Sequence, residues 1–328
     1  MTTQYFRPVP DISGGRWRLA GGWTGFSSFE LLTRGAPPRI VTDVPSEVIA
    51  ALTAPRPPVL GLSMDAPRIM GIVNVTPDSF SDGGHWNADG GIAHGRELIA
   101  EGAHILDIGG ESTRPGAAAV PVPEEIARTR PAIAALSAEA AVSVDTRKAQ
   151  VARAAVTAGA GMVNDVSGFD FDPGMAAAVA ESGAEVCLMH AQGLPENMQD
   201  DPCYGDVLLD VYDALALRIA RAEAAGIPRD RIVIDPGIGF GKTLEHNLAI
   251  LRRISLYHAL GVPVLLGASR KRFIGTIGGA GEAVRRDPGT LAVTLAAVQQ
   301  GIQIHRVHDV AGTRQGLALW QAIRGAEA

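Results

Sequence analysis

Cysteine is nearly absent from this chain of 328 residues, which contains only two. Cys187 lies inside an apolar run, Cys203 lies in a polar stretch, and they do not form a Cys-x-x-Cys pair. This usage argues against a disulfide framework and against a cysteine-based metal site. Both thiols are expected to be buried or incidental.

Long apolar runs and clusters of positive charge are also missing. No apolar stretch approaches the ~20 residues that cross a bilayer, and the start of the chain lacks a charged segment followed by an apolar one. The formal net charge is −6, and there is no run rich in Lys and Arg. These absences predict a soluble, cytoplasmic protein that binds neither membranes nor nucleic acid, although a local cationic pocket is compatible with them.

Aromatic residues make up only 5% of the chain, whereas hydrophobic residues as a whole make up 46%, and Ala and Gly are abundant. Such a core consists of small and branched aliphatic side chains packed between helices and strands. The composition therefore favours an α/β fold over a β-sandwich. The length allows two small domains or a single α/β barrel.

From residue 68 onward, short apolar runs alternate with amphipathic helical stretches. Most runs are apolar on both faces, as is typical of parallel strands covered by helices on one side and by a barrel interior on the other. Eight such units predict a (β/α)₈ TIM barrel over residues 68–328; an open doubly wound sheet is the alternative, but it would gather its ligand residues near one switch point. The predicted strands are 68–74, 103–110, 141–146, 161–166, 184–190, 231–237, 262–269 and 302–308, and the predicted helices include 124–139, 147–160, 204–226, 289–301 and 313–325.

Residues 1–67 differ in composition, being rich in Gly, Pro and Trp, and we expect an N-terminal extension of unreadable role. Residues 16–32 suggest one or two short strands, and residues 45–54 suggest a short helix. The Pro-rich stretch 54–59 is the expected linker to the barrel.

Polar residues stand at the carboxyl end of every one of the eight predicted strands. In a barrel, the loops after the strands form the active site, so these residues are candidates for binding and catalysis. Taken alone, Asp145 and Asn164 could equally be helix N-caps. Arg306 and His308 are two positions apart, so on a strand they point to the same face. The full set is Asn74; Glu111, Ser112, Thr113 and Arg114; Asp145; Asn164 and Asp165; Met189 and His190; Asp235; Ser269, Arg270 and Lys271; and Arg306, His308 and Asp309.

The stretch DPGIGFGKT (235–243) imitates a phosphate-binding loop. A Walker A loop needs Gly where this chain has Pro236, and the glycines at 237, 239 and 241 have the wrong spacing for the dinucleotide motif. Neither nucleotide-binding pattern is therefore present.

Lys242 and Lys271 raise another alternative, because a barrel lysine can act as a nucleophile that forms a Schiff base. Lys271 lies between Arg270 and Arg272, a setting that would activate an amine. The same cluster also suits an anionic substrate, and the residue types alone do not decide between the two roles.

Eight segments, taken in order, resemble the dihydropteroate synthase family, folate-biosynthesis enzymes of the pterin-binding barrel superfamily. The resemblance runs from about residue 68 to the end, and its first two segments are the most specific. The segments are MGIVNVTPDSFSDGG (70–84), LDIGGESTRPGA (106–117), SVDT (143–146), NDVSG (164–168), LMHAQG (188–193), IDPGIGFGKT (234–243), GASRKRF (267–273) and RVHDV (306–310).

The resemblance implies a transferase that condenses 6-hydroxymethyl-7,8-dihydropterin pyrophosphate with p-aminobenzoate and releases 7,8-dihydropteroate and pyrophosphate. It implies that Asp235 accepts hydrogen bonds from the 2-amino group and N3–H of the pterin, and that Lys271 binds O4 and N5 rather than forming a Schiff base. Asn164 and Asp145 are expected at the ring edge near N1 and N8. The other substrate-binding residues that it implies are Met189, which lies against the ring face, Phe240, Gly267 and Ser269.

The departing pyrophosphate needs cationic and hydrogen-bonding partners. By resemblance these are Asn74, Thr113, Arg306 and His308, with Mg²⁺ expected between Asn74 and the phosphates. Because Mg²⁺ prefers oxygen ligands and keeps several waters, one amide oxygen together with the diphosphate is a suitable set.

The family mechanism is dissociative: pyrophosphate leaves first, and the resulting cation on the pterin must be shielded from water. Residues 74–84 and 111–117 resemble the two loops that close over the site. The resemblance places Asp82 opposite Arg114, so that the loops are held together, and Phe80 and Pro115 beside the aminobenzoate ring.

Two other functions are compatible with a pterin-binding barrel. A methyltetrahydrofolate:corrinoid methyltransferase would not need the STRPGA loop or the pair Arg306 and His308, and a non-catalytic pterin-binding paralogue would be favoured by loss of a loop motif. The family resemblance further implies a homodimer and a sulfonamide target. Arg272 stands where other members can carry Ser near the aminobenzoate carboxylate, so that partner stays open, and backbone N–H groups at the start of the next helix are one option.

Overall fold

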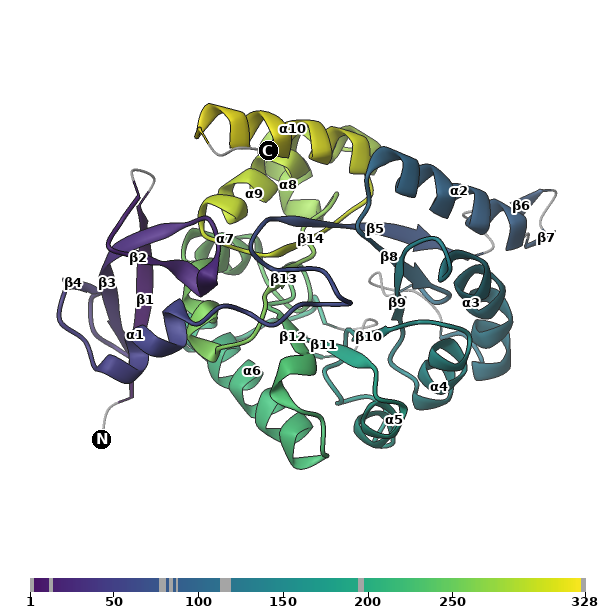
Figure 1. The fold of residues 1–328 in the computed structure, drawn as a ribbon, viewed down its shortest axis with the longest axis horizontal. Coiled ribbons are helices and arrows are strands. Elements are labelled where there is room, and N and C mark those ends of the chain that lie inside the picture. Colours follow the sequence, from purple (N-terminus) through teal and green to yellow (C-terminus); the bar gives the residue numbers. More distant parts are fainter. Residues whose placement is uncertain are drawn as a thin grey trace.

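The computed structural model describes residues 3–11, 14–76, 81–82, 85–86, 88–112, 119–193 and 198–325. From residue 68 the chain forms a parallel sheet in the order β12-β11-β10-β9-β8-β5-β14-β13 (Figure 1). Ile234 of β12 bridges Val264, just before β13, so the two ends of the sheet meet and the predicted (β/α)₈ barrel is confirmed. The strands are β5 (Arg68–Asn74), β8 (Ile105–Gly109), β9 (Ala141–Asp145), β10 (Met162–Asp165), β11 (Glu185–Met189), β12 (Ile232–Asp235), β13 (Leu265–Leu266) and β14 (Ile304–Val307).

Helices surround the barrel, and each of the five predicted helical stretches overlaps one of them (Figure 1). A two-strand hairpin of β6 (Ser81–Asp82) and β7 (His85–Trp86) precedes the first of them. Short 3-10 helices follow at Arg229–Arg231, Ile254–Leu260 (η3) and Ala283–Arg286. The α-helices of the barrel are α2 (Ala88–Glu101), α3 (Val122–Leu136), α4 (Ala149–Thr157), α5 (Met175–Ser182), α6 (Val207–Ala224), α7 (Leu244–Arg252), α8 (Arg272–Gly278), α9 (Asp287–Gln299) and α10 (Val310–Ile323).

The seventh barrel strand is much shorter than the predicted range 262–269. Pro263 has no N–H to give to the ladder, and only its carbonyl takes part, accepting from Ile234 N at 3.1 Å. Arg270 then adopts a left-handed φ of 57°, which turns the chain out of the strand. The two ends of the predicted strand are therefore loop, although the pairing that closes the barrel is kept.

Apolar side chains fill two layers of the barrel. A large core lies between the strands and the helices, and a smaller one fills the amino-terminal half of the barrel interior. Val59 and Met64, which precede the first barrel strand, belong to the inner core and are 1% and 3% exposed. Its strand members are Met70, Ile105, Met162, Cys187, Val233, Leu265 and Ile304. The inner core therefore closes the amino-terminal end of the barrel, and the carboxyl-terminal end of the strands stays open.

The N-terminal extension folds as a small antiparallel sheet beside the barrel (Figure 1). We expected one or two strands and a helix; the helix α1 (Ser46–Thr53) is present, and the sheet has four strands. Phe26, Phe29 and Leu52 are fully buried in a separate core of this unit. The strands are β1 (Gln4–Asp11), β2 (Trp17–Arg18), β3 (Gly25–Thr33) and β4 (Arg39–Val41), with a 3-10 turn, η1, at Leu19–Gly21.

The Pro-rich segment expected as a linker is itself packed against the barrel. Arg56 is 6% exposed and donates from Nη2 to the carbonyl of His258 at 2.7 Å. Leu60 N then donates to Glu185 Oε1 at 2.8 Å, at the start of β11. In Figure 1 this stretch crosses the centre of the barrel. The connection is therefore a plug for the amino-terminal mouth rather than a loose tether.

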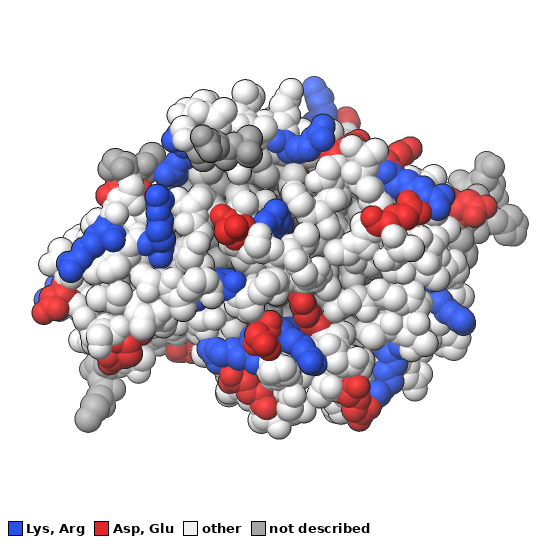
Figure 2. Space-filling model, viewed as in Figure 1, with Lys and Arg blue, Asp and Glu red and all other residues white. Residues whose placement is uncertain are grey.

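In the part of the chain that the structure describes, no helix is long and apolar enough to cross a membrane. On the face drawn in Figure 2, basic and acidic side chains are interspersed among uncharged ones. That face carries no continuous basic tract of the kind that follows a phosphate backbone.

We predict that Glu30→Gln destabilises the contact between the extension and the barrel. Glu30 accepts from Arg7 Nε at 2.6 Å and from Arg253 Nε at 3.0 Å, which joins β3 to the end of α7. Burial alone would raise the pKa of Glu30, but the two arginines lower it below its ordinary value. We expect a loss of about 1–2 kcal/mol in the free energy of unfolding, measured by urea titration at pH 7.

Glu47→Gln is the matched control, because Glu47 is an exposed residue of the same unit. Equal urea midpoints for the two variants would contradict a stabilising role of the Glu30 pairs.

Candidate functional site

Four polar side chains meet inside the barrel at the carboxyl ends of its strands. Asp107 on β8 accepts from Asn164 Nδ2 at 3.0 Å and from Arg306 Nε at 2.5 Å, both through Oδ2. Arg306 Nη2 also donates to Asp145 Oδ2 at 2.7 Å. Strand pairing explains the convergence, because Asn164 pairs with Asp145 in register across β10 and β9. The predicted residues Asp145, Asn164 and Arg306 are thus brought together.

Asp107 is the member of this cluster that the sequence analysis missed. It is fully buried, with no exposed surface, and it touches both the amide and the guanidinium group. The predicted site residues lie at the carboxyl ends of the strands, whereas Asp107 lies in the middle of β8. The sequence does contain a sign of it: Asp107 is a carboxylate inside the apolar run AHILDIGG, two positions before Gly109 and so on the same face of the strand.

Neither Asp145 nor Asn164 caps a helix, which removes the alternative that they are N-caps. The side chain of Asp145 faces Arg306, and Asn164 faces Asp107. Two other strand-end residues do have local structural roles. Asp165 accepts from Ser167 N and Phe169 N, both at 2.8 Å, and Asp309 caps α10 by accepting from Gly312 N at 2.9 Å.

Several buried oxygen atoms in this cluster have no hydrogen-bond partner among the described residues. They are Asp107 Oδ1, Asp145 Oδ1 and Ser143 Oγ, from the neighbouring strands β8 and β9. Asp107 and Ser143 pair in register, so these oxygens lie side by side in the barrel. Buried polar atoms are normally paired with protein, water or ligand. The cluster is therefore suited to a partner that presents N–H donors.

Asp235 lies at the end of β12, across the barrel from this pair of strands. Its Oδ1 accepts from Gly237 N at 2.7 Å, and Oδ2 faces the open position above Gly267, where a Cβ would be 3.3 Å away. Burial raises the pKa of Asp235 to about 6, against the lowering effects of the Gly237 N–H and Lys271. Met189 pairs with Asp235 in register and is 3% exposed. Gly267 thus leaves room beside a carboxylate.

Lys271 follows Ser269 and Arg270 after β13, and the three side chains go to different places. Arg270 turns away, binding Asp287 with two hydrogen bonds of 2.8 Å. Ser269 Oγ lies 2.9 Å from His308 Nδ1. Lys271 Nζ lies 4.0 Å from the centre of the Phe240 ring, a cation–π distance. The left-handed φ of Arg270 is what separates Lys271 from its neighbour.

Arg306 is held by carboxylates instead of standing alone as an anion-binding group. Burial lowers its pKa, but Asp107 and Asp145 raise it above its ordinary value, so it stays charged. Its Nη1 makes no hydrogen bond to the described residues, and its side chain is 20% exposed. One edge of the guanidinium group therefore remains available at the mouth of the barrel.

Asn74 ends β5, and among the described residues no hydrogen bond to its side-chain amide is found. In the same part of the chain, no group of three His, Cys, Asp or Glu side chains is arranged to hold a metal ion. The amide oxygen is thus the single protein ligand that this position offers.

Several predicted site residues cannot be placed. Phe80, Thr113, Arg114 and Pro115 lie outside the described residues. Asp82 belongs to β6, but its side chain is likewise outside the description. Their predicted roles stay predictions.

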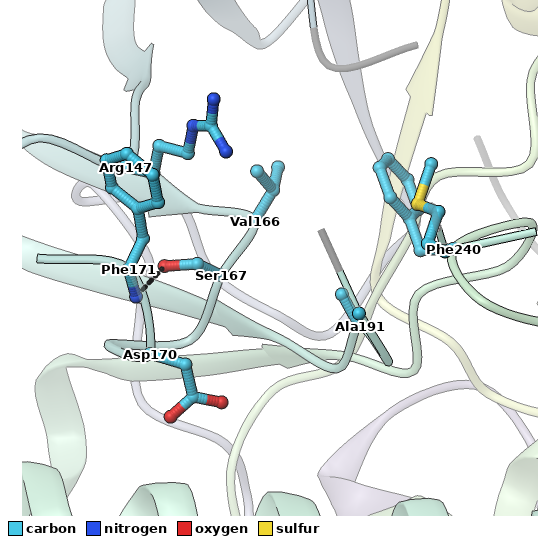
Figure 3. A pocket seen from close by; sticks show the side chains of 9 residues that line it. Arg147, Val166, Ser167, Asp170, Phe171, Ala191 and Phe240 are labelled. Carbon is cyan, nitrogen blue, oxygen red and sulfur yellow. Dashed lines mark hydrogen bonds between the residues drawn. The ribbon is translucent and has the colours of Figure 1, made fainter. Parts of the chain in front are cut away.

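A separate cavity of about 260 Å³ opens beside the cluster, between the ends of β10, β11 and β12. Figure 3 shows Arg147 and Phe171 on one side of it and Phe240 on the other. The Arg147 guanidinium carbon lies 4.0 Å from the centre of the Phe171 ring. Phe240 thus forms part of this wall and also contacts Lys271.

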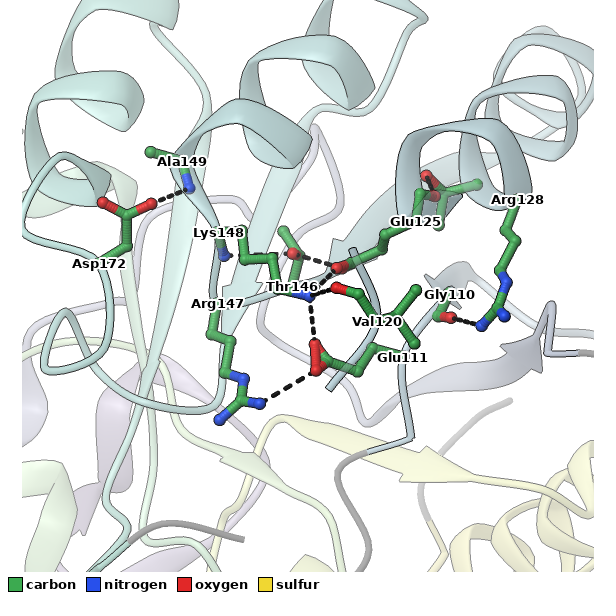
Figure 4. A network of polar contacts seen from close by, with 11 residues as sticks. Gly110, Glu111, Val120, Glu125, Arg128, Thr146, Arg147, Lys148, Ala149 and Asp172 are labelled. Carbon is green, nitrogen blue, oxygen red and sulfur yellow. Dashed lines mark hydrogen bonds and ion pairs between the residues drawn. The ribbon is translucent and has the colours of Figure 1, made fainter. Parts of the chain in front are cut away.

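A buried ionic network supports the two ends of the loop after β8 (Figure 4). Lys148 Nζ donates to Glu111 at 2.6 Å, to Glu125 at 2.5 Å and to the carbonyl of Val120 at 2.7 Å. Arg147 adds a hydrogen bond of 3.0 Å to Glu111. Burial alone would raise the pKa of Glu111, but Lys148 and Arg147 lower it below its ordinary value. One ammonium group therefore ties residue 111 to residue 120.

Comparison with known proteins places this geometry in a family. Residues 70–308 match the model of the pterin binding enzyme family. The dihydropteroate synthase of Escherichia coli is 44% identical over 269 residues, covering 81% of this chain and 95% of its own. The match leaves about a fifth of this chain without a counterpart in that relative.

Solved structures agree with this match. The Xanthomonas albilineans dihydropteroate synthase with 4-aminobenzoic acid has a TM-score of 0.78 and 50% identity, over 83% of this chain and 99% of its own. The same enzyme in complex with 7,8-dihydropteroate has a TM-score of 0.74 and 47% identity, over 81% and 97%. The Yersinia pestis enzyme with a sulfonamide drug has a TM-score of 0.77 and 43% identity, over 81% and 97%.

We predict that Lys148→Met destabilises the chain by about 3–5 kcal/mol, because two buried carboxylates lose a shared cation. Since the native pKa of Glu111 is lowered, the network stabilises the fold at neutral pH and less so as the pH falls below about 4.5. The difference between wild type and variant in urea unfolding should therefore narrow in acid.

Arg153→Met is the control, because its pair with Glu181 is exposed, at 47% and 63%, and exposed pairs contribute only about 0–1 kcal/mol. If Lys148→Met cost no more than this control, the network would be dispensable for stability.

Proposed function

The chain belongs to the pterin-binding enzyme family, and we propose that its barrel performs the dihydropteroate synthase reaction with the strand-end side chains described above. It is a transferase that makes dihydropteroate from 6-hydroxymethyl-7,8-dihydropterin pyrophosphate and p-aminobenzoate. The observation that carries the assignment is the cluster of Asp107, Asp145, Asn164 and Arg306 at the open mouth of the barrel. Its buried oxygens without a partner among the described residues suit a donor-rich ligand.

Asp235 is proposed to accept the 2-amino group and N3–H of the pterin. Its Oδ1 already accepts from Gly237 N, but a carboxylate oxygen has two lone pairs and can accept again. The absent side chain at Gly267 leaves space for the ring beside Oδ2. A neutral, flat ring with two adjacent N–H donors can hydrogen-bond to a buried carboxylate, whereas a second negative charge there would be repelled.

Asn164 is proposed to bind the opposite edge of the ring. A carboxylate only accepts, so the contact with Asp107 identifies the nitrogen of the Asn164 amide and fixes its orientation. The amide oxygen is then left to accept from a ring N–H, with Asp145 Oδ1 next to it. Lys271, set against Phe240, is proposed to donate to O4 and N5.

Departure of pyrophosphate requires positive charge and hydrogen-bond donors where negative charge develops. Arg306 Nη1 and His308 are proposed to supply them, together with Thr113. Mg²⁺ fits the amide oxygen of Asn74, since this ion prefers oxygen and accepts a single protein ligand when phosphates and waters complete its shell. Bound there, it would neutralise charge on the leaving group.

The arylamine of p-aminobenzoate is neutral and nucleophilic at pH 7, so the proposal assigns no general base. Catalysis then rests on positioning and on stabilising the leaving group. The closing of the loops at residues 74–84 and 111–117 over the site stays a prediction. The partner of the aminobenzoate carboxylate stays open between Arg272, which is exposed on α8, and the backbone N–H groups at the start of that helix.

The homodimer and the cytoplasmic location are likewise proposals. Exposed Ile277 on α8 and Leu319 and Ile323 on α10, at 61%, 60% and 84%, are compatible with an apolar contact between copies. Binding of sulfonamides in place of p-aminobenzoate is proposed from the similarity to the Yersinia pestis enzyme, which was solved with such a drug.

The test of the function is pyrophosphate release by the purified chain. Given the dihydropterin pyrophosphate in Mg²⁺, we expect release that depends on p-aminobenzoate, matches dihydropteroate formation one to one, and is lost in EDTA. A sulfonamide should compete with p-aminobenzoate. Binding of the pterin without condensation would instead support a non-catalytic paralogue or a methyltransferase.

We further predict that ionisation of Asp235 makes the affinity for the pterin rise with pH up to about 6. Above that pH, Asp235 causes no further change in affinity. The native pKa of about 6 means that the carboxyl group is protonated in acid and then cannot accept both ring donors. At pH 5, 6-hydroxymethylpterin should bind about ten-fold more weakly than at pH 7, measured by calorimetry.

Asp235→Asn should bind weakly and without this pH dependence. If the variant kept the wild-type dependence, another group would be responsible, and buried Asp145, whose pKa burial also raises, would be the next to test.

A further inference from the structure

The glycine-rich loop PGIGFGKT (236–243) after β12 resembles a phosphate-binding loop but matches neither nucleotide-binding motif. Its lysine, Lys242, has no role in the function proposed above. Lys242 is only 2% exposed. Three glycines of this loop have left-handed φ values: Gly237 at 68°, Gly239 at 82° and Gly241 at 60°. A segment this constrained and this buried calls for a physical reason.

The ammonium group of Lys242 binds backbone carbonyls from two loops. Nζ lies 2.9 Å from Gly237 O, 3.0 Å from Phe240 O and 3.2 Å from His190 O. It also lies 3.0 Å from His190 Nδ1, which must accept because an ammonium group only donates. Burial lowers the pKa of Lys242 to about 7, against the opposing effect of the Asp235 carboxylate.

The glycines let the loop press against the end of β11. A Cβ at Gly237 would lie 1.9 Å from His190 O, and one at Gly241 would lie 2.3 Å from Gln192 O. Any side chain at these positions would push the two loops apart. The lysine and the glycines therefore act together, since the glycines allow the close approach that Lys242 holds.

Side chains outside the loop fix its remaining backbone groups. Asn247 of α7, 3% exposed, accepts from Gly239 N at 2.7 Å. Tyr204 Oη donates to Gly241 O at 2.7 Å, and Gln199 Nε2 donates to Gly239 O at 2.6 Å. The loop is thus anchored on both sides of Phe240.

Phe240 is the residue that this anchoring presents to the site. Its carbonyl is bound by Lys242, and its ring lies 4.0 Å from Lys271 Nζ. A Cβ at Gly239 would lie 3.2 Å from Lys271 Cδ, so the loop also follows the stem of that side chain. The loop therefore packs along the side chain of Lys271.

We propose that Lys242 is a positioning residue: it holds the loop after β12 so that the Phe240 ring fixes the ammonium group of Lys271 against the pterin. This inference rests on the proposed function, because Lys271 matters only if it binds that substrate. Lys242 touches no substrate and acts through Phe240.

A double-mutant cycle tests the inference. Lys242→Met keeps the length of the side chain and removes every hydrogen bond of Nζ, and Phe240→Ala removes the ring. We expect Lys242→Met to lower kcat/KM for the dihydropterin pyrophosphate about 10- to 100-fold in the wild-type background and less than two-fold in the Phe240→Ala background. A loss of equal size in both backgrounds, or no loss at all, would overturn the proposal.

Tyr204→Phe provides the second arm in case Lys242→Met does not fold. It removes one hydroxyl from the anchor at Gly241 and keeps the ring, so the fold is retained. The loss of kcat/KM should be smaller, about three-fold, and should again vanish in the Phe240→Ala background. Additive losses here would also count against the proposal.

The dissociation constant of 6-hydroxymethylpterin, measured by calorimetry, separates failure of this inference from failure of the proposed function. If the wild type binds the pterin but has no synthase activity, the proposed function is wrong. The double-mutant cycle is then measured with the dissociation constants of the pterin in place of kcat/KM. Non-additive binding losses then support the positioning role, and additive losses reject it.

Discussion

The site depends on one interaction, the guanidinium group of Arg306 held between the carboxylates of Asp107 and Asp145. Carboxylates buried at the carboxyl end of a barrel carry a large desolvation cost, which a cation with several directed N–H groups can offset. Arg306 uses Nε and Nη2 for these carboxylates, and its Nη1 makes no hydrogen bond to the described residues. Without it, strands β8 and β9 would bring two unpaired negative charges together in a closed space. With it, the remaining oxygens need only neutral donors, which a pterin ring provides.

Two buried lysines extend the same principle to the loops. Lys148 joins the ends of the loop after β8 through Glu111, Glu125 and the Val120 carbonyl, and Lys242 joins the loops after β11 and β12 through carbonyl oxygens. Each is an ammonium group whose donors converge on backbone that the sheet alone would not order. The rigid strands fix the positions of the strand-end side chains, and these two lysines fix the loops around them.

The sequence predicted the barrel because parallel strands in this fold are apolar on both faces and recur with helices between them. It also predicted Asp145, Asn164, Asp235 and Arg306 as site residues, and the structure brings the first, second and fourth together. Asp107 was missed because a polar residue inside a strand reveals its role only through the partners that the barrel brings across from β10 and β14. Strand β1 was missed because Pro8 and Pro10 argue against a strand, yet β1 pairs only with β3 and so lies at an edge, where proline is tolerated.

The N-terminal extension lies outside residues 70–308, the part of the chain that matches the family model, and it packs against the outer helices of the barrel. Its described polar contacts to the barrel reach α6, η3, the end of α7 and the end of α9. They include Tyr5 to Asp213 at 3.0 Å, Arg7 to Ser255 at 3.1 Å, Glu30 to Arg253 at 3.0 Å and Trp23 Nε1 to the carbonyl of Val298 at 2.8 Å. The last part of the extension fills the amino-terminal mouth with Val59 and Met64, at the end of the barrel away from Asp145 and Asp235. Apolar burial at that end stabilises the strands from below, while the carboxyl ends keep the polar groups that apolar packing could not satisfy. Stability and chemistry are therefore assigned to opposite ends of the same eight strands.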